Sequence, residues 1–456
     1  MSGATHGRAA ADRPPRLRFA QTLRLAGRSL RHRNFRLFTI GQTLSLTGTW
    51  MQQVAVGWLV YRLTDSALLL GVVGFVSQGP AFLLAPLAGV VADRFDRRRI
   101  VIATQSLMLV QAAVLAVLVL TGTITIAWIV TLMAVLGALN GFDIPARQSF
   151  LTELVGGRED LPNAIALNSS MFNAARLIGP AVAGFLIAAA GEGICILVNA
   201  ISYVAVLVCL FAMQLPGRQH VPATGAVFRR VIEGFRYAFG FDPIRTILAL
   251  VALTSLVAVP FTVLLPVVAT TVLGGDARTL GVLMAATGLG ALAGALFLAS
   301  RRSVRGLGRV IVYAAVIFGC SLIGVALSRS LVLSVLMLIG AGLGMMVQMA
   351  ASNTVLQTLV DEDKRGRIMS LYSMAFIGIT PLGSLFAGAL ASRFGAPLTI
   401  ATGGVACIAG AAVFASRLPR LRAQVRPIYE RLGIIPEVAT GIQAVTHQHT
   451  SEPANG

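Results

Sequence analysis

The 456-residue chain is 56% hydrophobic and 12% charged, and it carries 37 Lys and Arg against 18 Asp and Glu. With a mean hydropathy of +0.80, this composition is typical of a polytopic membrane protein and excludes an ordinary soluble domain. A net charge of +19 would suggest nucleic-acid binding in a soluble protein, but the arginines here cluster between apolar runs of roughly 20 residues. We therefore expect the charge to set membrane topology, and we expect no nucleic-acid partner.

The first residues are basic and are expected to stay outside the membrane interior. The first 30 residues lack an apolar stretch followed by a cleavage site of small residues, so we predict no cleaved signal peptide. From Arg16 to Arg36, Arg alternates with Leu and Phe, which fits a basic helix on the membrane surface or a disordered basic tail equally well. We assign no transport chemistry to this segment.

Twelve apolar segments follow, each close to the length of about 20 residues that spans a bilayer as a helix. The predicted spans lie at 37–61, 67–92, 99–121, 125–145, 165–190, 194–214, 245–271, 279–299, 310–327, 331–355, 369–390 and 397–416. Because the number is even, both termini fall on the same side of the membrane.

Basic residues divide unevenly between the two sets of loops. One side holds the clusters Arg8–Arg36, Arg94–Arg99, Arg218–Arg236, Arg301–Arg309, Lys364–Arg367 and Arg417–Arg431. The other side holds Arg62, Arg278, Arg329 and Arg393. Since Lys and Arg accumulate on the cytoplasmic side, we place both termini and the central loop in the cytoplasm of a protein of the cell (inner or plasma) membrane.

The two halves of the chain repeat each other. Leu70–Val72 matches Leu280–Val282 at an offset of 210 residues, and Leu151–Val155 resembles Leu356–Val360. The same correspondence relates Arg99–Val101 to Arg309–Ile311 and the region near Gly184 to that near Gly388. Two six-span halves in the same orientation are typical of a secondary transporter with parallel repeats and a central binding cavity.

We therefore predict an all-α polytopic membrane fold, with twelve transmembrane helices in two six-helix bundles related by a pseudo-two-fold axis. The expected units are a basic N-terminal segment (1–34), an N-terminal bundle (35–214), a cytoplasmic central loop (215–244), a C-terminal bundle (245–416) and a cytoplasmic tail (417–456).

The turn between the second and third spans, Gly89–Arg99, concentrates charge between two apolar segments. Asp93 at a helix end can accept hydrogen bonds from a neighbouring helix N-terminus, and Arg97 can bridge it to a nearby acid. Such contacts would hold the cytoplasmic side shut while the cavity opens outward. The competing interpretation is that the charges only anchor the turn and enforce topology. Since Lys and Arg set the membrane topology without the help of an acid, we favour a gate for Asp93 and Arg97 and an anchor for Arg99.

Residues of this turn also carry a family resemblance. The spacing G-x-x-x-D-R-x-x-R-R resembles the signature of the major facilitator superfamily, and it is matched by Gly89, Asp93, Arg94, Arg97 and Arg98. Three further segments are similar to the enterobactin-exporter-like and macrolide-efflux-like branch, namely Asn168–Pro180, Arg365–Arg367 and Pro381–Gly383. The resemblance covers about residues 30–420 and implies efflux of siderophores, macrolides or other amphipathic compounds.

The chain departs from the family pattern in two places. Ser303 stands where the second half would repeat Asp93, so the full gate signature occurs in the first half alone. On the fifth span, Gly179, Pro180 and Gly184 fit the antiporter signature G-P-x-x-G-G, but alanine occupies its penultimate position. The motif supports antiport, and a helix bend with close small-residue packing is an equally open interpretation.

Coupling to protons requires a group that changes charge near the cavity, and acids within spans are costly enough to suggest a function. Asp143 is the best candidate, since it lies four residues before Arg147 and on the same helix face if Pro145 does not disturb the register. A protonation cycle at Asp143 could alternate with pairing to Arg147 or Arg176. A permanent Asp143–Arg147 ion pair is the competing interpretation, and it is preferred. Arg176 needs an acid, carbonyl groups or an anionic substrate, with structural pairing again preferred.

Gln53 and Gln357 are the candidates for the substrate cavity among the polar residues of the spans, most of which are expected to bond between helices. The five histidines lie in the tails and the central loop, which argues against an intramembrane HExxH enzyme. The only lysine, Lys364, follows Asp363 and belongs to no phosphate-binding loop, which argues against an ATP-driven pump.

These observations predict a monomeric secondary transporter that exports small amphipathic molecules of drug or siderophore type, by alternating access and proton antiport. We expect no enzymatic activity, no cofactor and no metal, and the partners are the substrate, protons and membrane lipids. Two alternatives remain open, a membrane scaffold or sensor that transports nothing and an importer of a narrow range of substrates.

Overall fold

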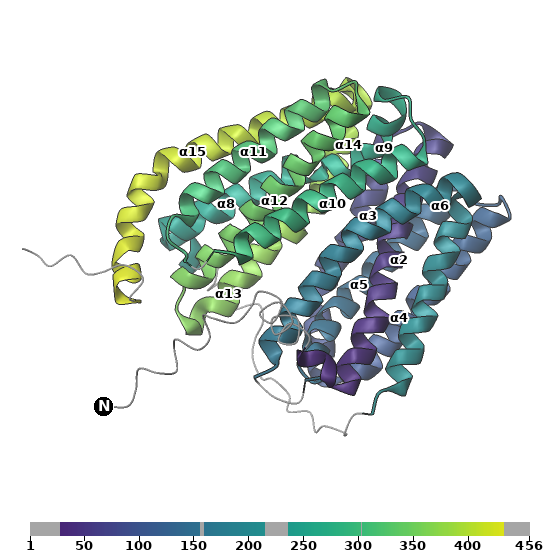
Figure 1. The fold of residues 1–456 in the computed structure, drawn as a ribbon, viewed down its shortest axis with the longest axis horizontal. Coiled ribbons are helices and arrows are strands. Elements are labelled where there is room, and N and C mark those ends of the chain that lie inside the picture. The colour runs from purple at the N-terminus through teal and green to yellow at the C-terminus, as the bar shows by residue number, and fades with distance from the viewer. Residues whose placement is uncertain (1–27, 156–158, 215–235, 302, 433–456) are drawn as a thin grey trace, which may run out of the picture.

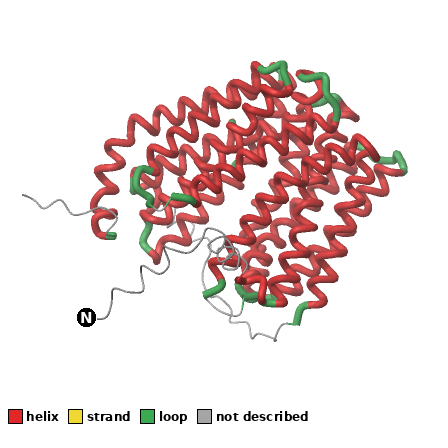
Figure 2. Tube along the Cα trace, in the orientation of Figure 1, coloured by secondary structure: helices red, strands yellow, loops and turns green. Residues whose placement is uncertain are grey.

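The computed structural model describes residues 28–155, 159–214, 236–301 and 303–432, and these residues form helices joined by short loops, without a strand (Figures 1 and 2). In chain order the elements, with short 3-10 or π segments labelled η, are η1 (Arg28–Arg31), α2 (Arg33–Thr64), α3 (Ala67–Arg94), α4 (Arg97–Leu120), α5 (Ile126–Leu151), α6 (Leu161–Ala212), α8 (Asp242–Val257), η2 (Val259–Leu264), α9 (Leu265–Val267), η3 (Val268–Val272), α10 (Ala277–Ala299), α11 (Leu307–Leu327), α12 (Leu331–Leu359), α13 (Glu362–Ser373), η4 (Met374–Gly378), α14 (Thr380–Phe394) and α15 (Ala396–Arg431).

The predicted all-α fold of twelve spans in two bundles is confirmed. Ten helical segments of the described chain are long and apolar enough to cross a membrane. One of them, α6, runs for 52 residues and contains a break at Gly191, so it supplies both the fifth and the sixth span. The first span is α2, which is 32 residues long and is not among those ten segments. Prolines interrupt the seventh span at Pro260 and Pro266, where a missing backbone donor breaks the regular helix.

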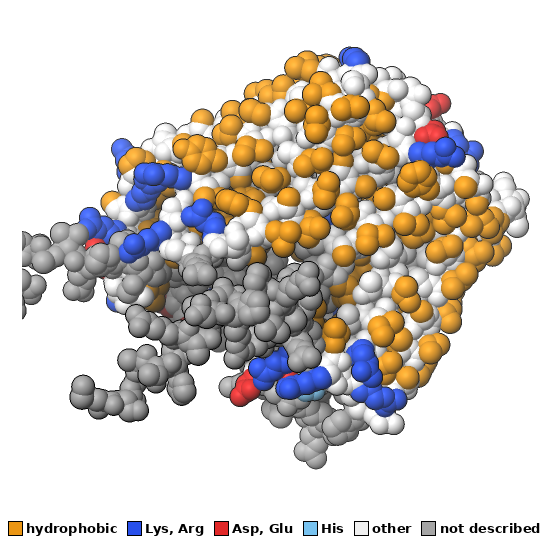
Figure 3. All heavy atoms as spheres, in the orientation of Figure 1, with side chains coloured by type: hydrophobic (Ala, Val, Ile, Leu, Met, Phe, Trp, Pro, Cys, Tyr) orange, Lys and Arg blue, Asp and Glu red, His pale blue; other side chains and the backbone are white. Residues whose placement is uncertain are grey.

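The last helix extends further than the predicted span at 397–416. α15 continues to Arg431, because Leu418, Leu421 and Val425 keep an apolar face that packs against the C-terminal bundle. This extension forms the yellow end of the ribbon in Figure 1. In the same view, apolar side chains cover much of the flank of both bundles, and arginines gather near the helix ends (Figure 3).

The buried core is shared between the bundles at one end of the molecule and divided at the other. One hydrophobic cluster includes Leu59 of α2, Leu264 of η2 and Leu280 of α10, and so joins both halves. A second cluster, around Phe150 of α5, belongs to the N-terminal half, and a third, around Leu356 of α12, belongs to the C-terminal half. We call the end with the shared core the distal end and the end with the divided cores the basic end. The bundles converge toward the first and spread toward the second (Figure 1).

Two glycine pairs bring the bundles to backbone contact near the distal end. A Cβ placed on Gly71 of α3 would lie 2.9 Å from Cα of Gly388 on α14, and 2.6 Å from the carbonyl oxygen of Ser384. A Cβ on Gly184 of α6 would lie 2.8 Å from Cα of Gly281 on α10. Since real side chains do not tolerate such distances, these positions must stay glycine for the helices to cross this closely.

We predict that Gly71→Ala and Gly281→Ala each force the bundles apart at the distal end. Overpacking of this kind costs about 1–3 kcal/mol and should shift the population toward a state with that end open. The distance between spin labels at Leu63 and Leu398, which are exposed near the distal ends of the two halves, should lengthen.

Gly79→Ala on the same helix α3 is the matched control, because its Cβ would meet the ring of Phe75 at an ordinary 3.6 Å. The control should leave the distance distribution unchanged. Unchanged distributions in the Gly71 and Gly281 variants would show that the crossings do not hold the distal end closed.

Candidate functional site

A buried acid lies at the centre of a polar network in the N-terminal bundle. The carboxylate of Asp143 on α5 is 2% exposed and accepts hydrogen bonds from Thr104 Oγ1 at 2.8 Å and Gln105 Nε2 at 2.9 Å, both on α4. Arg147 places its Nε 3.2 Å from the other Asp143 oxygen and donates from Nη1 to Gln42 Oε1 of α2 at 2.8 Å. The network therefore links three helices through one ion pair.

The four-residue spacing of Asp143 and Arg147 keeps both side chains on one helix face. Pro145 lies between them within α5 and leaves the helix continuous through Leu151. Burial of a carboxylate is costly unless it is paired and hydrogen-bonded, and here an arginine, a hydroxyl and an amide meet those needs together. Loss of the charge on Asp143 would leave Arg147 with a neutral partner.

The C-terminal half repeats this arrangement without charge. The alignment that relates Leu151 to Leu356 also relates Asp143 to Gln348 and Arg147 to Ser352 on α12. Gln348 is fully buried and donates from Nε2 to Thr254 Oγ1 of α8 at 3.2 Å. The two bundles thus have equivalent helices in equivalent places, with a titratable pair in one and neutral amides and hydroxyls in the other.

Arg176 lies apart from this ion pair. It is halfway along the first span of α6, about fifteen residues or roughly 22 Å from the helix start at Leu161. Its guanidinium carbon is 5.8 Å from the ring centroid of Trp50, and that ring meets Phe172 edge-on at 5.9 Å between centroids. Among the described residues Arg176 forms no ion pair, so of the structural partners expected for it no acid is found there.

The antiporter-like motif on α6 contacts two different helices. A Cβ on Gly179 would lie 2.6 Å from Cβ of Trp50 on α2, within the same bundle. Pro180 and Gly184 instead face α10, since a Cβ on Gly281 would lie 2.7 Å from the carbonyl oxygen of Pro180. The motif therefore supplies close packing both inside the N-terminal bundle and across to the other half.

The predicted gate residues lie at the basic end of α3 and α4. Arg97 donates from Nη1 to Glu153 Oε1 at 2.8 Å, and Arg98 donates from Nη2 to the carbonyl oxygen of Leu210 at 2.8 Å. Both bonds stay within the N-terminal bundle. The side chain of Asp93 lies outside the described residues. The remaining members of the motif are Arg94 and Gly89. Arg94 is exposed, and a Cβ placed on Gly89 would contact no other atom.

A small cavity lies between the bundles, midway along the helices. Its volume is about 90 Å³, and its lining includes Gln53 and Gly57 of α2, Gln78 of α3 and Pro266 of α9. Gln53 is thus placed between the halves. Gln357 does not line this cavity, since it lies near the basic end of α12, exposed and hydrogen-bonded to Asn353.

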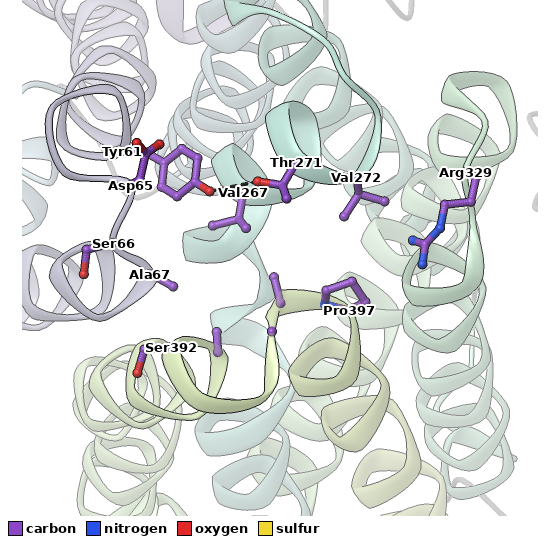
Figure 4. Close-up of a pocket in the computed structure, with 13 residues that line it drawn as sticks. Tyr61, Asp65, Ser66, Ala67, Val267, Thr271, Val272, Arg329, Ser392 and Pro397 are labelled. Carbon is purple, nitrogen blue, oxygen red and sulfur yellow. Dashed lines mark hydrogen bonds between the residues drawn. The ribbon is translucent and has the colours of Figure 1, made fainter.

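A larger cavity of about 650 Å³ opens at the distal end (Figure 4). Tyr61 is one helical turn beyond Gly57, and its hydroxyl is 2.8 Å from Thr271 Oγ1 across the gap between the halves. Asp65 and Arg329 contribute opposite charges to the lining. The Tyr61–Thr271 hydrogen bond therefore joins the two halves at the lining of the distal cavity.

A family model described as "Transmembrane secretion effector", from the major facilitator superfamily, matches residues 26–436. The chain belongs to this family. It is a multi-pass membrane transporter of the major facilitator superfamily, as the resemblance in the gate turn implied.

Curated relatives within the superfamily cover most of the chain. A staphyloferrin A transporter of Staphylococcus aureus is 28% identical over 81% of this chain and 93% of its own length. The multidrug efflux pump Tap of Mycolicibacterium fortuitum is 27% identical over 82% of this chain and 93% of its own. These relatives confirm the siderophore and drug-efflux branch.

Solved structures with the same fold are more distant in sequence. A bacterial homologue of the human lysosomal transporter Spinster, in an inward-facing and unoccupied conformation, has a TM-score of 0.63 at 16% identity and covers 89% of this chain and 99% of its own. A peptide transporter of the POT family has a TM-score of 0.68 at 13% identity, covering 85% and 94%. Both support the major facilitator fold.

An ion-pair cluster that the sequence analysis missed fastens the N-terminal segment of this transporter. Asp160, just before α6, meets Arg28 Nε at 2.6 Å, Arg31 Nη2 at 2.7 Å and His32 Nε2 at 2.8 Å. Ser29 Oγ donates to the backbone oxygen of Asp160 at 2.9 Å. The contact with His32, followed by those with the two arginines, lowers the pKa of Asp160 below its ordinary 3.8. An acid two residues before Pro162 marks the start of a helix in the sequence, but no local pattern indicated its pairing with residues 28–32.

We predict that Asp160→Asn releases η1 from the start of α6, because the replacement removes the negative charge that pairs with Arg28 and Arg31 and contacts His32. A spin label at position 33, in a cysteine-depleted background, should become more mobile. A carboxylate with a lowered pKa contributes its stabilisation above its ordinary pKa and loses it as the pH falls through the lowered value. The parent chain should therefore stay docked from pH 8 to pH 5 and loosen only below 3.8.

Glu159→Gln is the matched control, since Glu159 is 86% exposed and its one ion pair within the described residues is with Arg28. It should leave the label as immobile as in the parent chain. Loosening of the parent chain above pH 5 would contradict the assignment to Asp160.

Proposed function

We propose that this transporter exports small amphipathic molecules of drug or siderophore type across the cell membrane in exchange for protons. The observation that carries the proposal is the buried Asp143–Arg147 pair, which links α2, α4 and α5 in one bundle and is replaced by Gln348 and Ser352 in the other. In this proposal the basic end faces the cytoplasm, as the positive-inside rule favours.

Proton coupling would operate by making and breaking this pair. With Asp143 charged, Arg147 is held between the carboxylate and Gln42. Protonation of Asp143 removes the Coulomb attraction and leaves Arg147 uncompensated in a low-dielectric region, which favours a rearrangement that hydrates the arginine. Since Gln42, Thr104 and Gln105 are on neighbouring helices, such a rearrangement would change helix packing within the N-terminal bundle.

Alternating access would follow from the two ends of the molecule. The glycine crossings and the Tyr61–Thr271 hydrogen bond join the bundles at the distal end, whereas the core is divided at the basic end. This arrangement corresponds to a state that opens toward the cytoplasm. Rocking the bundles would separate Gly71 from Gly388 and bring the Arg97–Glu153 region toward the C-terminal half.

Arg176 is better placed for the substrate than for the proton. It has an aromatic neighbour in place of an acid, and Trp50 and the half-exposed Phe172 beside it offer flat apolar surfaces. A guanidinium in this setting favours a ligand that combines a carboxylate or phenolate with an apolar body. The names of the relatives support such a range, since they include a transporter of the siderophore staphyloferrin A and a multidrug efflux pump.

We predict that Asp143→Asn abolishes transport driven by a pH gradient while substrate exchange without a gradient continues. Asparagine keeps the size of the side chain but cannot carry the proton. In proteoliposomes, gradient-driven flux should fall by about tenfold or more. A tenfold fall corresponds to an increase of ~1.4 kcal/mol in the activation free energy of transport. Dyes, macrolides and carboxylate or catecholate siderophores form the substrate panel.

Asp242→Asn serves as the control, because Asp242 is exposed at the start of α8 and pairs with Arg245. It should transport like the parent protein. If gradient-driven flux survives in Asp143→Asn, the pair is structural. If the parent moves no member of the panel in either direction, the sensor or scaffold alternative gains support, and uptake in place of efflux would favour an importer.

We predict that Arg176→Gln selectively weakens the binding of anionic substrates. Loss of a hydrogen bond to a charged group costs about 1.5–3 kcal/mol, so the KM for a carboxylate siderophore should rise roughly tenfold to a hundredfold. Neutral and cationic dyes should be little affected. Arg176→Lys should restore part of the affinity, since it keeps the charge but not the planar fork.

Arg278→Gln is the matched control for loss of one positive charge, since Arg278 is exposed at the distal end. Equal losses for anionic and neutral substrates in Arg176→Gln would show that Arg176 supports helix packing instead. We also propose that the transporter acts as a monomer, which light scattering of the purified protein in detergent would test.

A further inference from the structure

A third cavity, lined mainly by apolar side chains, lies at the basic end of the C-terminal bundle, away from the two cavities between the halves. It has a volume of about 270 Å³ and lies between the extension of α15 and the bundle helices α8, α11 and α12. Its apolar lining includes Ile247, Ile311, Leu359, Phe414, Leu421 and Val425. The volume is below the roughly 300–1,000 Å³ of sites that enclose drug-sized ligands, and the lining suits a hydrocarbon chain.

Three arginines border this apolar lining. Arg426 is paired with Glu430 through Nε at 2.7 Å. Arg305, from the turn before α11, and Arg422, on α15, also line the cavity. Among the residues that the structure describes, neither of these two side chains forms an ion pair or a hydrogen bond. Arg305 and Arg422 therefore contribute two positive charges to a lining that is otherwise mainly apolar.

The cavity lies at the predicted end of a span, the depth at which the acyl chains of a membrane lipid meet its charged headgroup. The apolar span predicted for α15 ends near 416, and Arg417 and Arg420 follow on its exposed side. Basic residues just outside a span attract anionic headgroups, while neighbouring apolar side chains remain within reach of acyl chains. A ligand with a phosphate at one end and a hydrocarbon chain at the other matches both features.

We propose that this cavity binds an anionic phospholipid, with one acyl chain in the pocket and the phosphate between Arg305 and Arg422. The lipid would fasten the extension of α15 to α8 and α12 and so complete the packing of the C-terminal core at the basic end. This site is separate from the proposed proton and substrate sites, and lipid binding can be measured without any transport.

Binding of phosphatidylglycerol to the purified full-length transporter, measured by native mass spectrometry against phosphatidylcholine with the same acyl chains, tests the headgroup contacts. Arg305→Gln and Arg422→Gln should each weaken phosphatidylglycerol binding about fivefold, the equivalent of one arginine near an anionic lipid. Arg420→Gln, on the same helix but outside the cavity, should bind like the parent. Equal losses in all three variants would mean diffuse attraction of anionic lipid and would overturn the site.

The acyl chain is tested with a phosphatidylglycerol that carries a diazirine near the end of one chain. Photolysis should label peptides that contain Ile247, Leu359 or Val425, and Val425→Phe should reduce the labelling by filling the pocket. Labelling of other lipid-facing helices alone would overturn the proposal. A second outcome would also overturn the proposal. If, in lipid-free protein, residues of the lining cross-link to residues after 432 and these cross-links block the labelling, then the chain itself occupies the pocket.

Discussion

Backbone contact at two glycine pairs is the constraint on which the arrangement of the two bundles depends. At Gly71–Gly388 and Gly184–Gly281 the helices approach so closely that no side chain fits, and the shared hydrophobic core lies around these crossings. Toward the basic end each bundle has a core of its own. A molecule joined in this way can pivot at the distal end while the packing inside each bundle stays intact, because dense cores resist gradual deformation.

Hydropathy and repetition were sufficient for the fold, whereas contacts between the halves required the structure. Spans of sufficient length with charged turns follow from the physics of the bilayer, and so the twelve segments could be predicted. The repeat related Gly71 to Gly281 and Gly184 to Gly388, but the contacts pair them the other way, Gly71 with Gly388 and Gly184 with Gly281. An alignment of repeats gives equivalent positions, and the pseudo-two-fold axis then decides which of them meet.

The candidate site was predictable where it lies on one helix and unpredictable where helices meet. Asp143 and Arg147 share a face by their spacing alone, so their contact followed from the sequence. Thr104 and Gln42 enter the network through the rotation of α4 and α2 about their axes, which no local pattern specifies. The surroundings of Arg176 were unpredictable for a similar reason, because its depth within the span was evident but the neighbouring Trp50 was not.

The two bundles share a fold but differ in electrostatics. The buried Asp143–Arg147 ion pair lies in the first half, and Gln348 and Ser352 occupy the same level in the second. A neutral network costs less to bury and does not respond to protons, so in the proposed mechanism the N-terminal bundle senses the proton and the C-terminal bundle responds through the crossings. The absence of an acid at Ser303, opposite the gate signature of the first half, follows the same division. In the proposed mechanism the common fold of the two halves supplies the symmetry needed for rocking, and titration of the one Asp143–Arg147 pair biases it.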